Sequence, residues 1–154
     1  MVLESIDIRR ATIADRDGVE ALFQDVFGQA RPPETYDWLF YQGAPSGISV
    51  VAETEGKIVG HVGTMSRMVV CGAKEVVMAT SVDSMTHPGW QKRGINKLLA
   101  RRLIEENKAE GVGVFGGFSN ENSSYTVVQH QQRQSLGSIP LLVRPLRILT
   151  RPWR

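Results

Sequence analysis

The run from Glu75 to Phe118 constrains the fold more than any other part of the chain. Its first part, Glu75 to Met85, is rich in Val and Thr and predicts a strand. Apolar residues at helical spacing follow Gly94 and predict an amphipathic helix that Gly111 closes. Residues 113–118 then predict a second strand. Because a helix crosses over between these two strands, they should lie parallel in one sheet.

The remaining segments predict a mixed sheet around this unit. Glu55-Gly56 is a hairpin signal between two apolar runs, and Gly28 and Gly43 end two helical patterns. The predicted strands are residues 6–9, 48–53, 57–70, 75–85, 113–118 and 139–143, and the predicted helices follow Thr12, Pro32-Pro33, Gly94 and Asn122. We therefore expect an α/β fold in which a central mixed sheet is flanked by helices.

Chain length fits a single domain, since 154 residues lie within the roughly 100–200 that one domain usually takes. We assign residues 1–143 to this domain and residues 144–154 to a basic tail. The tail is either a solvated chain end or the start of a further segment. It carries Arg144, Arg147, Arg151 and Arg154.

Composition narrows the class of function. A formal net charge of +2 gives no reason to expect a nucleic-acid partner, and no apolar run is long enough to predict a membrane span. The single cysteine, Cys71, cannot form an internal disulfide, and no Cys/His cluster predicts a metal site. Nothing near Met1 predicts a leader, so we expect a cytoplasmic protein.

The turn from Thr86 to Asn96 predicts an anion site. The first N–H groups of a helix lack intrahelical partners, and the helix dipole adds partial positive charge there. Gly94 allows the backbone to approach a ligand closely, and Lys92 and Arg93 add full charges. Phosphate or pyrophosphate is the expected occupant.

These residues resemble the signature of the GNAT superfamily of acyl-CoA-dependent N-acetyltransferases. The run Gln91 to Asn96 is similar to its Gln/Arg-x-x-Gly-x-Gly/Ala motif, except that Asn96 replaces the last small residue. Further similarity lies in Thr86-His87-Pro88, Leu98-Leu99, residues 51–60 and Gly117 to Asn122. The resemblance extends from about Ile6 to Gly137.

The resemblance implies that acetyl-CoA is the co-substrate, with no metal. It implies N-acetyltransferase activity on a primary amine of a small molecule or amino sugar, by direct transfer in a ternary complex. The implied acetyl-CoA-binding residues are Met85, Thr86, Gln91, Lys92, Arg93, Gly94, Ile95, Asn96 and Asn122.

Two residues are candidates for proton transfer. Asp83 lies on the strand before the turn and is the candidate general base, with a structural strand carboxylate as the alternative. The resemblance implies a Tyr that protonates the leaving thiolate, and Tyr125 is the candidate, with packing against Phe118 as the alternative. Tyr36, Trp38 and Phe40 line an acceptor pocket or belong to the core.

Two further points stay open at the level of sequence. A non-catalytic acyl-CoA-binding module is the alternative function, and a nucleotide-phosphate binder is disfavoured because the turn lacks the usual nucleotide motifs. The resemblance also implies a C-terminal strand hairpin, of which only Ile139–Val143 is evident. We therefore expect a homodimer or a longer parent chain to complete the sheet.

Overall fold

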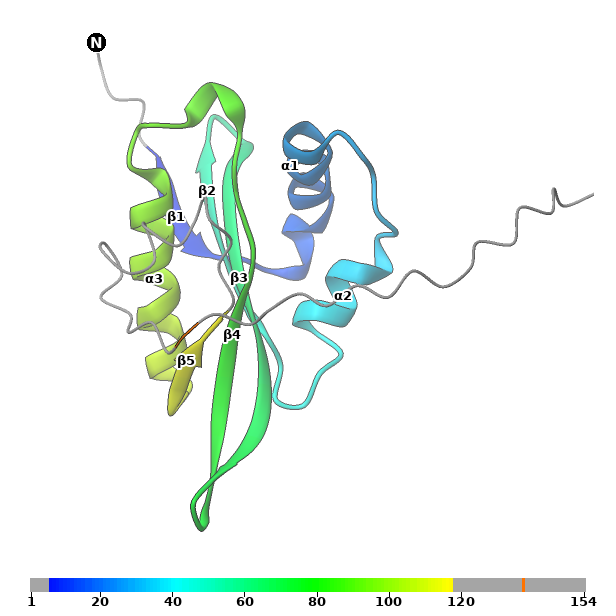
Figure 1. Ribbon diagram of the computed structural model, residues 1–154. Helices are drawn as coiled ribbons and strands as arrows, with labels where there is room; N and C mark the ends of the chain where they lie inside the picture. Colours follow the sequence, from blue (N-terminus) through cyan, green and yellow to red (C-terminus); the bar gives the residue numbers. More distant parts are fainter. Residues whose placement is uncertain (1–5, 118–136, 138–154) are drawn as a thin grey trace, which may run out of the picture.

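The computed structural model describes residues 6–117 and residue 137. Five strands form one sheet in the order β1-β2-β3-β4-β5 (Figure 1). The strands are β1 (Asp7–Arg10), β2 (Ile48–Thr54), β3 (Lys57–Cys71), β4 (Lys74–Thr86) and β5 (Val114–Gly116). Strands β1 to β4 pair antiparallel, and β5 pairs parallel to β4. The predicted mixed sheet and its single crossover are confirmed.

Helices cover both faces of this sheet. Helices α1 (Arg16–Phe27) and α2 (Glu34–Phe40) lie on one face, and α3 (Ile95–Ala109) lies on the other (Figure 1). Short 3₁₀ turns, Ile13–Asp15 and Pro88–Trp90, precede α1 and α3. No helix in residues 6–117 is long and apolar enough to span a membrane. The predicted helix after Asn122, the strand 139–143 and the tail 144–154 lie outside the described residues.

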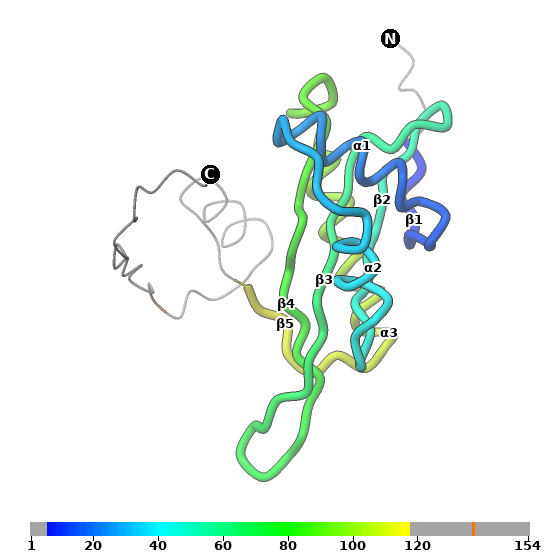
Figure 2. Tube along the Cα trace, turned by 90° about the vertical axis from the view of Figure 1, so that its right-hand side faces the viewer, coloured from blue at the N-terminus to red at the C-terminus, as the bar shows by residue number. Residues whose placement is uncertain are grey.

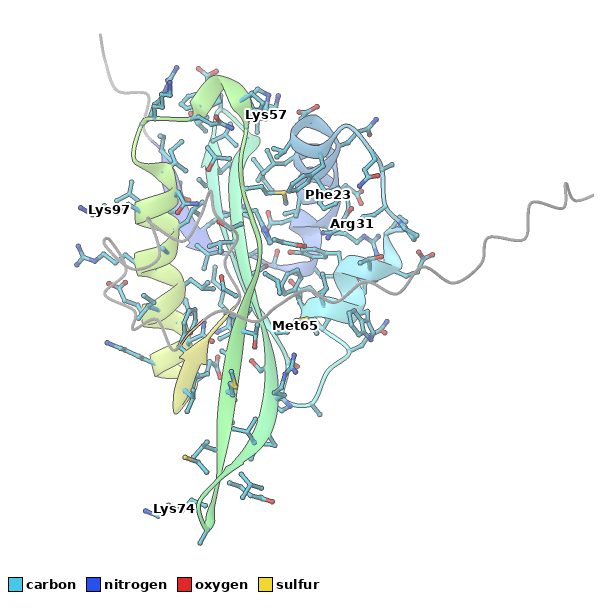
Figure 3. The ribbon with its side chains drawn as sticks, viewed as in Figure 1. Phe23, Arg31, Lys57, Met65, Lys74 and Lys97 are labelled. Carbon is cyan, nitrogen blue, oxygen red and sulfur yellow. The ribbon has the colours of Figure 1, made fainter. Side chains whose placement is uncertain are left out.

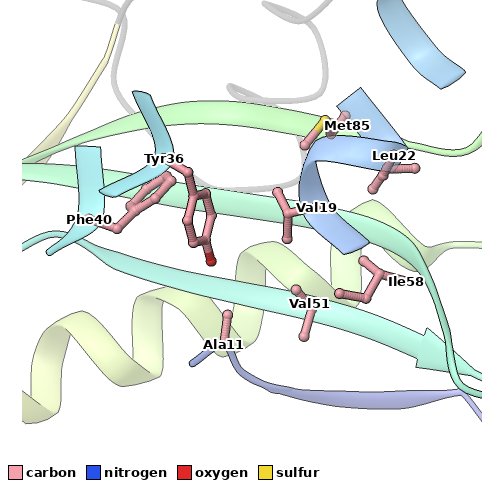
Figure 4. Close-up of a cluster of buried hydrophobic side chains, with 8 residues drawn as sticks. All are labelled: Ala11, Val19, Leu22, Tyr36, Phe40, Val51, Ile58 and Met85. Carbon is pink, nitrogen blue, oxygen red and sulfur yellow. The ribbon is translucent and has the colours of Figure 1, made fainter. Parts of the chain in front are cut away.

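Each face of the sheet has its own core. The cluster beneath α1 and α2 is shown in Figure 4 and consists of Ala11, Val19, Leu22, Tyr36, Phe40, Val51, Ile58 and Met85. The cluster beneath α3 consists of Ile48, Val50, Ala52, Val59, Val62, Ile95, Leu99 and Leu103. Helix α3 approaches β3 closely at Gly60, which has no side chain in the way. A Cβ added at Gly60 would meet Leu99 Cδ1 at 2.9 Å.

The β3–β4 hairpin runs out beyond the rest of the sheet (Figure 2). Pairing of β3 with β2 ends at Ile48↔Thr64, and pairing of β4 with β5 begins at Met78↔Val114. The outer part is therefore a two-stranded ribbon within the described chain. Two of its apolar side chains are largely exposed: Met68 is 51% exposed and Val70 is 73% exposed.

Strand β4 carries a bulge near its end. His61 pairs with Met85 but Gly63 pairs with Val82, so two β4 residues, Asp83 and Ser84, stand opposite one residue of β3. Asp83 takes a positive φ of 51° to accommodate the extra residue. The bulge therefore decides which side chains of β4 face α1 and which face α3.

Candidate active site

A pocket of about 950 Å³ lies between the end of β4 and the start of α3. Ser84, Met85 and Thr86 form its strand wall, and the turn before α3 forms its end. The pocket also extends along one side of α3 past Arg101. Its remaining lining residues are Trp90, Gln91, Lys92, Gly94, Ile95, Asn96, Lys97, Leu98, Ala100, Ile104, Glu105 and Lys108.

The turn before α3 offers a row of backbone donors. Lys92 and Gly94 both have positive φ, 62° and 79°. Within residues 6–117, the N–H groups from Lys92 to Asn96 have no hydrogen-bond acceptor, whereas the N–H of Trp90 donates to His87 O at 2.8 Å. Free N–H groups at the start of a helix are the usual means by which proteins bind phosphate.

The two cations of the turn differ in placement. Lys92 lines the pocket. Arg93 instead donates from Nη2 to Gly89 O at 3.2 Å, and its guanidinium stacks 4.4 Å from the centre of the Trp90 ring. The structure therefore places Arg93 against the 3₁₀ turn rather than among the pocket-lining residues.

A side-chain hydrogen bond connects the two walls of the pocket, β4 and α3. Asn96 Nδ2 donates to Ser84 Oγ at 3.0 Å, so the residue that departs from the GNAT-like motif connects α3 to β4. At the pocket end of β4, Thr86 Oγ1 is buried and has no partner among the described residues.

The pairing of β4 with β5 reaches only Thr80↔Gly116, which leaves the pocket end of β4 without a described neighbour on that side.

An ionic cluster lies on the opposite face of the same strand end. Arg31 donates from Nη1 to Asp83 Oδ2 at 2.6 Å and from Nε to both Glu20 oxygens at 3.0 and 3.1 Å. The Arg31 guanidinium also lies 4.2 Å from the centre of the Phe23 ring, and Figure 3 shows these two side chains together beside α1. The loop between α1 and α2 is thereby attached to the bulge of β4.

The cluster carries an excess of negative charge, since Arg31 stands between the carboxylates of Glu20 and Asp83. All three side chains are largely buried, with 12%, 16% and 17% of their surface exposed. Charges act more strongly in such surroundings than in open water. Asp83 Oδ1 has no hydrogen bond within residues 6–117.

His61 lies beneath this cluster and was not predicted from the sequence. It is completely buried on β3, and Nδ1 lies 2.9 Å from the backbone oxygen of Asp83. Because a carbonyl oxygen only accepts, Nδ1 carries the proton. Burial lowers the pKa of His61 to about 4, so the ring is neutral at physiological pH. The one available signal is a lone polar residue within the apolar run Val59–Val62.

The chain matches the family model of the acetyltransferase (GNAT) domain over residues 7–128. It belongs to the GNAT acetyltransferase family. The predicted family and enzyme class are therefore confirmed. A search of curated proteins by sequence found no match.

Solved structures share the fold of this GNAT acetyltransferase at low sequence identity. An acetyltransferase from Trypanosoma brucei superposes with a TM-score of 0.72 at 16% identity, covering 90% of this chain and 100% of that one. Glucosamine-6-phosphate N-acetyltransferase from Arabidopsis thaliana gives 0.70 at 18%, covering 92% and 99%. AAC(6')-Iy in complex with the bisubstrate analog CoA-S-monomethyl-acetylneamine gives 0.73 at 14%, covering 92% and 99%.

The aromatic residues of α2 divide between core and surface. Tyr36 and Phe40 are buried, and the Tyr36 hydroxyl lies 3.1 Å from Ser49 Oγ. Trp38 is 58% exposed. Tyr36 and Phe40 are therefore core residues, which was one of the two alternatives predicted from the sequence. The remaining predicted site residues, Asn122 and Tyr125, lie outside the described residues.

Proposed function

We propose that this GNAT acetyltransferase transfers an acetyl group from acetyl-CoA to a primary amine of a small molecule or amino sugar. The observation that carries the proposal is the row of N–H groups from Lys92 to Asn96 at the end of the pocket, which have no acceptor within residues 6–117. The fold relatives support the acceptor class, since one is named for glucosamine-6-phosphate and another binds a CoA-linked acetylneamine analog. We propose direct transfer in a ternary complex.

The donor would bind along the α3 side of β4. Its pyrophosphate would accept hydrogen bonds from the N–H groups of the turn, and Lys92 would add charge. The amides of the pantetheine arm need backbone and hydroxyl partners. The edge of β4 beyond Thr80, which has no described neighbour on the β5 side, and the buried hydroxyl of Thr86 offer both. We retain Arg93 and Asn122 as proposed contacts to acetyl-CoA.

The acceptor would bind on the Asp83 side, where the ionic cluster attracts an ammonium group. We propose that Asp83 Oδ1, which accepts no hydrogen bond within residues 6–117, takes a proton from that ammonium, directly or through water. The neutral amine nitrogen then attacks the acetyl carbonyl, the C–N bond forms and the C–S bond breaks. The nitrogen loses a second proton to solvent as it becomes the amide, which balances the proton gained by the thiolate. The departing thiolate takes up a proton, for which Tyr125 remains the proposed source. Bringing both substrates together supplies much of the acceleration.

A thiol-release assay with acetyl-CoA and a panel of amines and amino sugars tests this proposal, with calorimetric titration of CoA in parallel. We expect CoA to bind and at least one amine to release thiol. Binding of CoA without release with any amine would favour the non-catalytic acyl-CoA-binding module. A folded sample that gives no heat with CoA would refute the donor site.

Two expectations about the cellular form accompany this function. We propose a cytoplasmic protein that acts as a homodimer or within a longer chain. Light scattering during the activity assay tests the second point. A fully active monomer of the present chain would refute it.

A further inference from the structure

The inference concerns the bulge of β4 and rests on the function proposed above. Asp83 is a residue with a side chain held at a φ of 51°. Asp tolerates this region better than most residues, but the conformation is still unfavourable and persists only where surrounding contacts enforce it.

Two contacts hold Asp83, and they act on different groups. Arg31 binds the carboxylate at 2.6 Å, and His61 Nδ1–H donates to the backbone oxygen at 2.9 Å. The first contact orients the side chain. The second contact holds the backbone itself, at the point where the register of β3 and β4 shifts.

His61 is itself firmly placed. Its ring is fully buried, with its centre 5.6 Å from that of Phe40 and 6.2 Å from that of Tyr36. Nε2 is buried without a partner among the described residues. An unpaired buried acceptor is unfavourable, and an apolar ring would fill the same space without it. The donor on Nδ1 is therefore what a histidine contributes at this position.

The bulge lies between the two proposed substrate sites. Asp83 faces the ionic cluster, and the next residues, Ser84 to Thr86, form the strand wall of the pocket. We propose that His61 is a positioning residue for acyl transfer, whose Nδ1–H fixes the bulge and so sets the placement of the acceptor side relative to the donor side.

Two variants separate the hydrogen bond from the packing. His61→Phe keeps an aromatic ring beside Tyr36 and Phe40 but removes the donor. His61→Asn keeps a donor, because the asparagine Nδ2 occupies a place similar to that of Nδ1. We expect His61→Phe to lower kcat by about 10- to 100-fold, and His61→Asn to recover most of that loss. The Kd for CoA, which depends mainly on the turn 92–96 and less on the end of β4, should stay within about twofold in both.

A spectrum of the wild-type protein tests the same bond without activity or variants. The ¹⁵N resonances of the His61 ring should show a neutral ring with the proton on Nδ1 at neutral pH. A proton on Nε2 would overturn the proposal, as would equal kcat losses in the two variants or parallel losses of kcat and CoA affinity. If the wild type binds CoA but acetylates no amine, the proposed function fails, while the spectrum still decides whether His61 holds the bulge.

Discussion

The two sides of the β4 end offer different groups to the proposed substrates. On the α3 side, one continuous stretch of chain supplies the strand wall, the glycine-bearing turn and the helix start, and the main donors are backbone N–H groups. On the other side, Glu20, Arg31, His61 and Asp83 come from α1, a loop, β3 and β4, and the contacts are made by side chains. The side proposed for acetyl-CoA, the donor side, can therefore be recognised as a sequence motif. The residues of the side proposed for the amine, the acceptor side, come together only in the folded chain.

The two sides should also differ in the amino-acid substitutions that they tolerate. Backbone donors depend on φ and on helix geometry, so most side chains of the turn are free to change. A cluster of buried charges depends on each member, because removing one leaves its partner buried and unpaired. Mutations on the acceptor side should consequently affect turnover and stability, and mutations on the donor side should affect CoA affinity.

The largest expected effect is on the acceptor side. If Asp83 is the general base, Asp83→Asn should lower turnover by about 10²–10⁴-fold and leave CoA affinity nearly unchanged. Asn tolerates a positive φ as well as Asp does, so the bulge is retained. The pH–rate profile should also lose its acidic limb. Asp17→Asn, with a side chain that is 93% exposed, is the control. A loss below about tenfold would make Asp83 an ionic partner only.

Acid should lower the stability of the folded protein, because His61 becomes protonated more readily in the unfolded state. The ring takes up a proton near pH 6.5 when unfolded but only near pH 4 when folded. Between these values the unfolded state binds more protons, so stability is fully present above about pH 6.5 and falls towards pH 4, by about 3 kcal/mol in all.

Urea unfolding of the wild type and of His61→Asn across this window measures the effect, because the variant cannot titrate there. Asp15 acts in a lower window, since its hydrogen bond from Arg9 lowers its pKa to about 2. Stability curves that run parallel for the two proteins would contradict a neutral buried His61.

The donor side should respond to backbone geometry. Gly94→Val places a β-branched residue at a φ of 79° and should weaken CoA binding by about 10- to 100-fold. Gly72→Val is a matched control, because Gly72 has a φ of 63° at the distant hairpin tip. Calorimetry on both variants decides. Equal CoA affinities would show that the turn does not act through its backbone.

The smallest effect should come from charge on the donor side. Lys92→Ala should weaken CoA binding by about two- to fivefold, because an exposed cation contributes little beyond the backbone donors. The difference from wild type should shrink as salt is raised. If Lys92→Ala is more damaging than Gly94→Val, the site is a charge patch and the contrast between the two sides is wrong.

The sequence predicted the sheet, the crossover and the turn between β4 and α3 because each depends on local signals. Apolar alternation, the glycine at position 94 and the helical spacing after it lie within a few residues of the structure they specify. The bulge had no such signal. Simple alternation puts Val82 and Asp83 on opposite faces, yet Val82 packs on the α1 side and Asp83 binds Arg31 there.

The partners of Asp83 were missed for the same reason. Arg31 meets Asp83 across 52 residues, and His61 meets it across 22. Neither residue lies in a motif, and a buried histidine within a strand is usually a packing residue. The register of β3 against β4 brings His61 to Asp83, and the packing of the loop between α1 and α2 brings Arg31 there.

The projecting β3–β4 ribbon has a consequence for local opening. Between Ser66 and Val76 the described strands pair only with each other, whereas Gly60 to Thr64 are flanked by β2 and β4. A two-stranded ribbon is marginal in water by itself. Amide hydrogens near Gly72 should therefore exchange with solvent through fraying from the tip, and those at the His61 level only when the whole domain unfolds. The residues that hold the bulge thus lie in the slowest-exchanging part of a strand whose far end exchanges fastest.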